Sequence, residues 1–263
     1  MGARRRHDRA ERGGLRARPF GDSVASLDVD VGGAGQARAM TGVLSACLAD
    51  DEGERLDQQT LARWTLAQRL QGLIAVRLAG GAGRVGVGVT CPACGGGMEL
   101  DIELARFIAL PGAAEVAWRS TDGEEVIVRL PRGEDQERWS TNATSDPFAI
   151  ATSLVVTIDG APPPSDFRVP PTWLPGLDDA LEAHDPLTVL ALGAECPDCA
   201  VAAEHEVDLG AVLLREIGVE QRALLDDVCR LAAALHWSEV DILALPRWRR
   251  VQYLARIDAG SLL

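Results

Sequence analysis

Cys91-Pro92-Ala93-Cys94 and Cys196-Pro197-Asp198-Cys199 are two copies of the motif Cys-Pro-x-Cys in this 263-residue chain. Two residues between a pair of cysteines let one tight turn direct both sulfur atoms at the same metal ion. Two such turns supply the four ligands of a closed tetrahedral site. We therefore expect one structural zinc ion, bound by all four cysteines: Cys91, Cys94, Cys196 and Cys199.

The two cysteine pairs are separated by residues 95–195, a stretch of 101 residues, whereas a local zinc ribbon has about 15–20 residues there. Closing a loop of this length costs about 4 kcal/mol, and structural zinc binding contributes on the order of 10–16 kcal/mol in peptides. Because the free energy of zinc binding exceeds the cost of closing the loop, we expect zinc to join the strands before a long insertion to the strands after it.

Thiol–disulfide chemistry is the competing interpretation, since a Cys-x-x-Cys pair at the start of a helix has a lowered thiol pKa. Both pairs are instead followed by strand-like sequence, and two equivalent pairs would be redundant in a redox enzyme. His205 is an alternative ligand, but a lone polar residue in a strand is more often exposed. The single thiol of Cys229 lies on the apolar side of a predicted helix, so we expect it to be buried.

Catalytic motifs are missing from the sequence. Four cysteine ligands leave zinc no open position for a water nucleophile. There is no Gly-rich phosphate loop followed by Lys-Ser/Thr, no Gly-x-Ser-x-Gly and no His-Glu-x-x-His. We expect no enzyme activity and no small-molecule substrate.

Apolar and polar residues alternate around each cysteine pair, which predicts strands that form hairpins. The alternating runs cover 84–89 and 98–102 at the first pair, and 188–192 and 201–209 at the second. Asp122-Gly123 predicts another hairpin, because this dipeptide favours a two-residue turn.

Apolar residues at helical spacing predict helices in both terminal parts and in the middle of the chain. The predicted helices cover 60–78, 146–158, 177–183 and 213–235, with a short helix capped by Ser238 and a last one from Pro246 to near Ile257. Six prolines between 160 and 175 predict an extended connector. The predicted class is α+β: small antiparallel hairpins around a split four-cysteine, zinc-ribbon-like site, with helical N- and C-terminal parts.

Four segments follow from these patterns. We expect a disordered Arg-rich arm at 1–38, a helix with the first cysteine pair at 39–110, an inserted hairpin, helix and Pro-rich connector at 111–187, and the second cysteine pair with the C-terminal helices at 188–263.

The formal net charge of −13 disfavours binding to nucleic acid or anionic lipid, because both require a positive surface. The sequence contains no run of about 20 apolar residues, so it predicts no membrane span. The charged N-terminus is not followed by the apolar stretch of an export signal. We expect a cytoplasmic protein. The alternative function is a zinc-ribbon regulator that binds nucleic acid through the Arg-rich arm and the C-terminal arginines at 247, 249, 250 and 256.

The C-terminal segment His236-Trp237-Ser238-Glu239-Val240-Asp241-Ile242-Leu243-Ala244-Leu245-Pro246, with Arg249-Arg250 and Tyr253-Leu254 after it, resembles the T-even phage baseplate hub assembly protein family. The split Cys-Pro-x-Cys pairs and the stretch Leu130-Pro131-Arg132-Gly133-Glu134-Asp135 between them resemble its zinc-binding relatives in phage-like contractile injection systems. The resemblance covers about residues 40–258.

This resemblance implies a non-enzymatic structural or assembly role, chaperone-like, with baseplate or hub proteins as partners. It carries over the four cysteines as zinc ligands and no catalytic residue. Residues of the C-terminal segment would contact the partner: His236, Trp237, Ile242, Leu245 and Trp248. The sequence departs from the family pattern at Ala200, because glycine usually accommodates the tight backbone after such a cysteine pair, as Gly95 does after the first.

Overall fold

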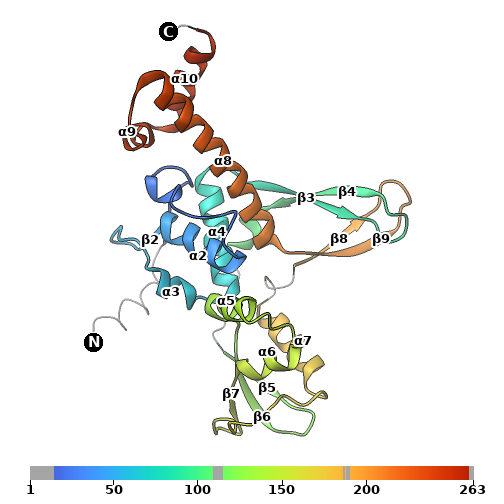
Figure 1. Cartoon of the computed structure of the whole chain (residues 1–263). Helices are drawn as coiled ribbons and strands as arrows, with labels where there is room; N and C mark the ends of the chain where they lie inside the picture. Colours follow the sequence, from blue (N-terminus) through green and yellow to red (C-terminus); the bar gives the residue numbers. More distant parts are fainter. Residues whose placement is uncertain (1–14, 109–114, 186, 188–189, 261–263) are drawn as a thin grey trace. The chain divides into compact units, whose positions relative to one another are not determined.

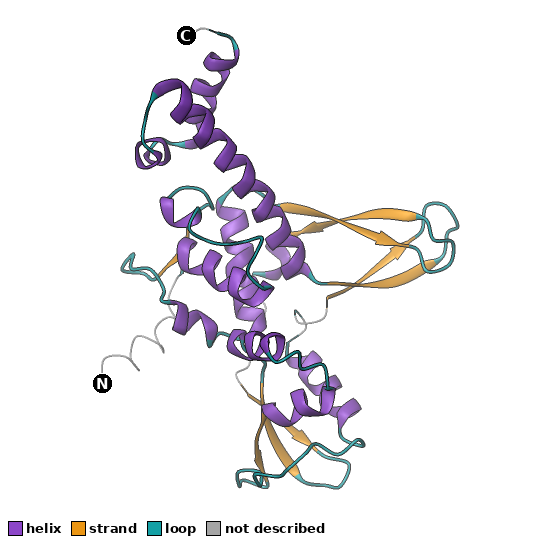
Figure 2. Ribbon diagram, in the orientation of Figure 1, coloured by secondary structure: helices purple, strands orange, loops and turns teal. Residues whose placement is uncertain are grey.

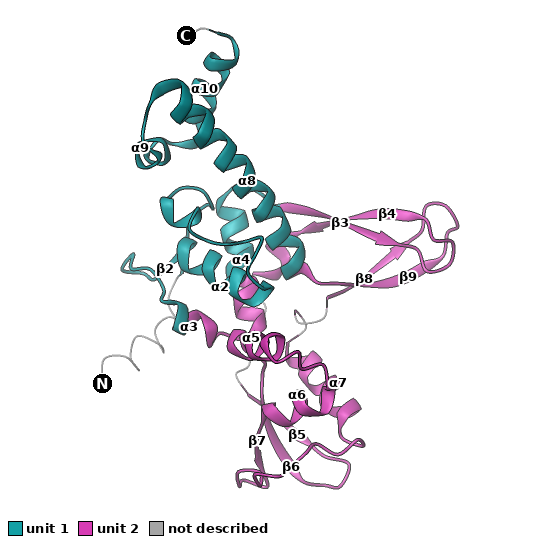
Figure 3. Ribbon diagram, in the orientation of Figure 1, with its two compact units in different colours: residues 1–60, 72–83, 210–263 teal, residues 61–71, 84–209 magenta. Residues whose placement is uncertain are grey.

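The computed structural model describes residues 15–108, 115–185, 187 and 190–260. The chain forms two compact units, which Figure 3 colours separately. Unit 1 consists of Met1–Thr60, Gly72–Gly83 and Gly210–Leu263, and unit 2 consists of Leu61–Gln71 and Arg84–Leu209. The four consecutive segments expected from the sequence are therefore not the units of the structure, since each unit combines stretches that are far apart in the chain.

Helices and small antiparallel sheets make up both units, which confirms the predicted α+β class (Figure 2). The elements found mainly in unit 1 are β1 (Arg16–Ala17), the 3-10 helix η1 (Val24–Ser26), α2 (Gln36–Cys47), β2 (Leu48–Ala49), α8 (Leu209–Leu235), α9 (Glu239–Ala244) and α10 (Arg247–Asp258). The helices α3 (Gln58–Ala62) and α4 (Leu66–Ala79) each lie partly in both units.

Residues 15–38 form regular elements and make long-range contacts, whereas a disordered arm was expected at 1–38. Residues 1–14 of that arm lie outside the described residues. Strand β1 pairs with β2, and the side-chain amide of Gln221 on α8 donates to the carbonyls of Ser26 at 3.0 Å and Val29 at 2.6 Å. Buried Arg250 on α10 donates to the carbonyl of Gly21 at 3.4 Å. These long-range contacts order a segment whose own sequence is polar and lacks periodicity.

The helix predicted at 60–78 is divided in two. Thr65 and Gln68 form a reciprocal cap: the N–H of Thr65 donates to the Gln68 side chain at 2.9 Å, and the N–H of Gln68 donates to the Thr65 hydroxyl at 3.3 Å. This arrangement is a capping box, which starts a new helix at Leu66. Asp57 lies immediately before α3, and its carboxylate accepts the N–H of Thr60 at 2.8 Å.

The C-terminal helices enclose a core of their own within unit 1. Buried residues from α8, α9 and α10 form it: Val228, Leu231, Ile242, Leu243 and Leu254. Ser238 caps α9, as predicted, by accepting the N–H of Asp241 at 3.2 Å. Pro246 immediately precedes α10, where a proline can end one helix and begin the next.

Unit 2 contains a three-stranded sheet in the order β5-β6-β7, with β5 at Glu115–Arg119, β6 at Glu125–Arg129 and β7 at Val155–Ile158. The predicted turn at Asp122-Gly123 joins β5 to β6, and Gly123 has a φ of 92°. The sheet packs against α6 (Pro147–Leu154) and α7 (Leu174–His184). Arg129 of β6 forms an ion pair with Asp135 of α5 (Gly133–Thr141), and the 3-10 helix η2 covers Leu104–Phe107.

The helix predicted at 146–158 ends early, and its last four residues form β7. Asp146 caps α6 by accepting the N–H of Phe148 at 3.0 Å. The sequence Val155-Val156-Thr157-Ile158 consists entirely of β-branched residues, which favour a strand, and β6 supplies the pairing partner. Tertiary pairing therefore overrides the apolar periodicity of this segment.

Within the described residues, no helix combines the length and apolar character needed to cross a membrane.

Candidate metal centre

Two antiparallel hairpins of unit 2 carry the cysteine pairs (Figure 1). In the first, β3 (Arg84–Thr90) pairs with β4 (Gly97–Glu103), ending at Thr90 opposite Gly97. In the second, β8 (Leu190–Glu195) pairs with β9 (Ala202–Val207), ending at Glu195 opposite Ala202. Each hairpin therefore presents a cysteine pair in its connecting loop, and the two loops lie at the same end of the hairpins.

The backbone of the two loops follows the same hydrogen-bond pattern. The N–H of Cys91 donates to the carbonyl of Gly96 at 2.9 Å, and the N–H of Gly95 donates back to Cys91 at 3.0 Å. In the second loop, Cys196 donates to Val201 at 3.0 Å and Ala200 donates back to Cys196 at 2.9 Å.

Ala200 adopts a left-handed backbone conformation, with a φ of 57°, and Gly95 has a φ of 75° at the equivalent position. The tight turn is therefore kept at the second pair although alanine replaces glycine. Because an L-residue with a side chain is disfavoured in this region by about 1–2 kcal/mol, the second loop is locally strained.

The four cysteine sulfurs converge on one point, all within 4.8 Å of one another. Sγ of Cys91 lies 3.7 Å from Sγ of Cys199, and Sγ of Cys94 lies 3.7 Å from Sγ of Cys196. A tetrahedral site with metal–sulfur bonds of about 2.3 Å requires sulfur–sulfur separations of about 3.8 Å. The spacing fits a four-thiolate metal site, and all four cysteines are free thiols.

One sulfur of each pair is protected and one faces the surface. Cys91 and Cys196 are buried, at 1% and 2% exposure, whereas Cys94 and Cys199 are exposed. The four ligands come from both loops, so metal binding would join the two hairpins.

The environments of the thiols differ in their electrostatics. The backbone N–H groups of Cys94 and Ala93 lower the pKa of Cys91 to about 7. The N–H of Val201 lowers the pKa of Cys199, but desolvation and the three neighbouring thiols outweigh it and raise this pKa to about 12. Cys91 therefore ionises before Cys199, because a thiolate at Cys91 disfavours a second negative charge beside it.

His205 lies outside the cluster of candidate ligand atoms formed by the four cysteines, and it is buried, contrary to the expectation that it would be exposed. It lies opposite Leu192 in the second hairpin, with 9% of its surface exposed. Alternation along β9 places His205 on the same face as buried Val207, while Glu204 and Glu206 face outward. Its Nε2 atom is buried without a hydrogen-bond partner.

The predicted partner-binding residues are divided between core and surface. Ile242 is fully buried in the C-terminal core, which excludes it from contact with a partner in this fold. Trp237 packs against that core and makes an edge-on contact with Tyr253, with 5.0 Å between ring centroids. Leu245 is half-buried. His236 and Trp248 are exposed, Trp248 to 67%.

Cys229 is exposed on α8, contrary to the expected burial. Its neighbour Val228 provides the core contact instead.

Gly96 and Asp198 lie at the candidate metal centre, but no sequence motif marks either residue. A β-carbon at Gly96 would lie 2.6 Å from Oδ2 of Asp198 and 3.3 Å from Sγ of Cys94. This approach between the two loops appears only in the folded chain.

No family model, curated protein or solved structure matches this chain. The geometry of the four cysteines is therefore the principal indication of function.

Proposed function

We propose that the four cysteines bind one structural zinc ion, and that the chain is a non-enzymatic structural or assembly protein of a contractile tail baseplate, in a phage or a phage-like injection system. The first part rests on the convergence of four thiols from two distant loops. The second rests on the resemblance of the C-terminal segment, the split cysteine pairs and residues 130–135 to the hub assembly family.

The thiol geometry is the observation that carries the zinc assignment. Two sulfur–sulfur distances of 3.7 Å match a tetrahedral ion with four thiolate ligands. Iron accepts the same ligand set, so metal analysis decides between the two ions. We favour zinc because it supplies stability without redox chemistry.

A structural role follows from where the apolar contacts lie along the hairpins. Buried residues are concentrated away from the cysteine loops: Val85, Val87, Ile102, Leu190 and Val207. Near the loops the strand residues are exposed or half-buried, as at Met98, Glu99 and Ala194. Two-stranded hairpins are marginally stable alone, so a metal ion would stabilise the end where side-chain burial is weakest.

Elemental analysis of the purified chain tests the metal assignment. We expect one zinc per chain, and we expect the Cys196→Ser variant to lose it together with much of its resistance to denaturant. Cys229→Ser is the matched control, because that cysteine is exposed and outside the site. A metal-free Cys196→Ser protein as stable as the wild type would overturn the structural role, and one iron per chain would overturn zinc.

Association with baseplate proteins tests the assembly role. We expect the chain to co-purify with a neighbouring baseplate or hub protein, and Trp248→Ala to weaken this, because an exposed tryptophan is a typical anchor at interfaces. Absence of any such association would contradict the proposal. Binding to DNA that weakens steeply with salt would favour the nucleic-acid alternative, which the net charge of −13 disfavours.

A further inference from the structure

The contact between Gly96 and Asp198 is a second link between the two cysteine loops. Asp198 is the second residue between Cys196 and Cys199, and its carboxylate occupies the space beside Gly96, two residues after Cys94. We infer that these two residues form a size-complementary contact that sets the distance between the loops, and that Asp198 is a positioning residue of the metal centre. This inference rests on the proposed metal binding.

Backbone conformation does not explain the glycine at position 96. Gly95 has a φ of 75° and needs the freedom of glycine, but Gly96 lies outside the left-handed region. The equivalent residue of the second loop is Val201, in a loop with the same backbone hydrogen bonds. A β-branched residue is therefore compatible with this position of the turn, and the remaining reason for glycine is the approach of Asp198.

The side chains at two equivalent positions are small in the first loop and larger in the second. The first loop has Ala93 between its cysteines and Gly96 after them, whereas the second has Asp198 and Val201. The larger residue inside the second pair thus faces the position that lacks a side chain in the first. This pairing predicts that enlarging residue 96 is tolerated only when residue 198 becomes smaller.

A side chain at position 96 would act on the ligands from two directions. Its β-carbon would meet Asp198, which adjoins Cys199, and would also press on Sγ of Cys94. Metal–ligand distances tolerate deviations of only about 0.2 Å. Asp198 is exposed and can rotate away from a small group, so alanine at 96 should cost less than valine.

Metal affinity measured on the full chain tests this coupling. Zinc affinity is measured by competition with a chromophoric chelator, and the cobalt(II) absorption spectrum reports tetrahedral geometry. We expect Gly96→Val to weaken zinc binding by about tenfold, in the range found for residues that support metal ligands. Asp198→Ala alone should change affinity by less than ~3-fold, and the Gly96→Val/Asp198→Ala double variant should recover most of the loss.

Two control variants separate size from other effects. Gly97→Ala should retain wild-type affinity, because nothing lies within 4 Å of a β-carbon there. Asp198→Asn keeps the shape and removes the charge, so it should not rescue Gly96→Val. Rescue of Gly96→Val by Asp198→Asn would overturn the size argument. So would additive losses of affinity in the double variant, or wild-type affinity in Gly96→Val.

Metal content of the wild-type chain and coupling between positions 96 and 198 are separate measurements. A wild-type chain that binds no metal refutes the metal centre itself, whereas normal binding without coupling between positions 96 and 198 refutes only the inference. If Gly96→Val does not fold, the milder Gly96→Ala variant is measured. Adding Asp198→Ala must then restore the zinc affinity that Gly96→Ala loses. If the losses of the two substitutions add instead, the inference is overturned.

Discussion

The guanidinium of Arg69 lies against the backbone of Gly133, in the space that a β-carbon at Gly133 would occupy. Arg69 is fully buried on α4, and its Nη1 atom donates to the carbonyl of Leu61 at 3.0 Å. Burial lowers the pKa of Arg69 to about 10. Gly133, the first residue of α5, therefore provides room for a buried cation within unit 2.

Gly133→Ala should destabilise unit 2 by roughly 1–3 kcal/mol, because overpacking forces a buried side chain to move. Chemical denaturation measures this change. Gly193→Ala is the matched control, since a β-carbon there meets nothing within 4 Å. Equal stability of the two variants would contradict the close packing of Arg69 on Gly133.

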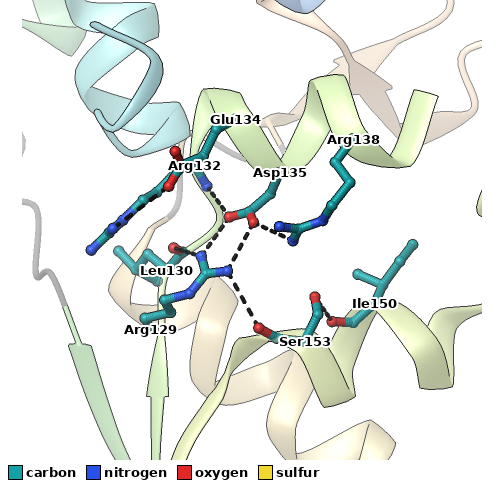
Figure 4. Close-up of polar contacts among 8 residues, drawn as sticks. All are labelled: Arg129, Leu130, Arg132, Glu134, Asp135, Arg138, Ile150 and Ser153. Atoms are coloured by element: carbon teal, nitrogen blue, oxygen red, sulfur yellow. Dashed lines mark hydrogen bonds and ion pairs between the residues drawn. The ribbon is translucent and has the colours of Figure 1, made fainter. Parts of the chain in front are cut away.

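Asp135→Asn should cost about 3–5 kcal/mol of folding stability at neutral pH, the usual effect of removing one partner from a buried ion pair. The carboxylate of Asp135 is 1% exposed; it accepts Nη2 of Arg129 at 2.8 Å, the N–H of Arg132 at 3.0 Å and Nη2 of Arg138 at 2.6 Å (Figure 4). The free energy of unfolding in urea checks the prediction. Glu134→Gln, on an exposed ion pair of the same helix turn, should change it by less than ~1 kcal/mol.

The same carboxylate predicts acid sensitivity. Burial raises the pKa of Asp135, but the bonds from Arg129 and Arg132 outweigh it and hold the pKa below its usual value. A lowered folded-state pKa contributes stability above the unfolded value of about 3.9, and this contribution is lost as the pH falls through the folded value. The difference in unfolding free energy between wild type and Asp135→Asn should therefore shrink below about pH 4. A difference that stays constant down to pH 2 would contradict this assignment.

Ala200→Gly should stabilise the metal-bound chain by about 0.5–1 kcal/mol, because it removes a side chain from the left-handed region. Gly95→Ala, at the equivalent position of the first loop, should destabilise it by a similar amount. Thermal unfolding with excess zinc measures both. If both substitutions shift the midpoint in the same direction, the two loops do not share one backbone conformation.

Thiol reactivity should divide the six cysteines into three classes. Cys229 is exposed and should react fast in the metal-loaded chain, and the four cysteines of the centre should react after chelation. Cys47 should stay silent, because burial raises its pKa to about 11 and leaves little thiolate. A colorimetric thiol assay should count one fast thiol before chelation and five after it. A count of five before chelation, in zinc-loaded protein, would contradict metal ligation.

Truncation of Trp237 should lower the folding stability, whereas truncation of Trp248 should not. Trp237→Ala should lower stability by roughly 2–4 kcal/mol, since its ring packs against the C-terminal core. Trp248→Ala should leave stability within about 0.5 kcal/mol of the wild type, because this ring is exposed. Denaturation curves of both variants provide the comparison, and a large loss of stability in Trp248→Ala would remove it as a surface contact.

Local patterns in the sequence determined much of the fold. The cysteine spacing and the flanking alternation predicted both cysteine hairpins. Asp122-Gly123 predicted the hairpin of β5 and β6, and Ser238 predicted the start of α9. Each of these features depends on residues within a few positions of one another. The capping box of Thr65 and Gln68 was equally local, and the pattern Thr-x-x-Gln would have revealed the division of the first long helix.

Other features depend on residues that are far apart in the chain and meet only when it folds. The N-terminal segment is ordered by Gln221 and Arg250, and residues 155–158 become a strand because β6 pairs with them. The core around α9 takes Ile242 away from the surface. The spacing within each pair is local, so the sequence alone identified the four cysteines of the candidate metal centre. Their convergence, and the approach of Asp198 to Gly96, depend on contacts across about 100 residues, which no local pattern encodes.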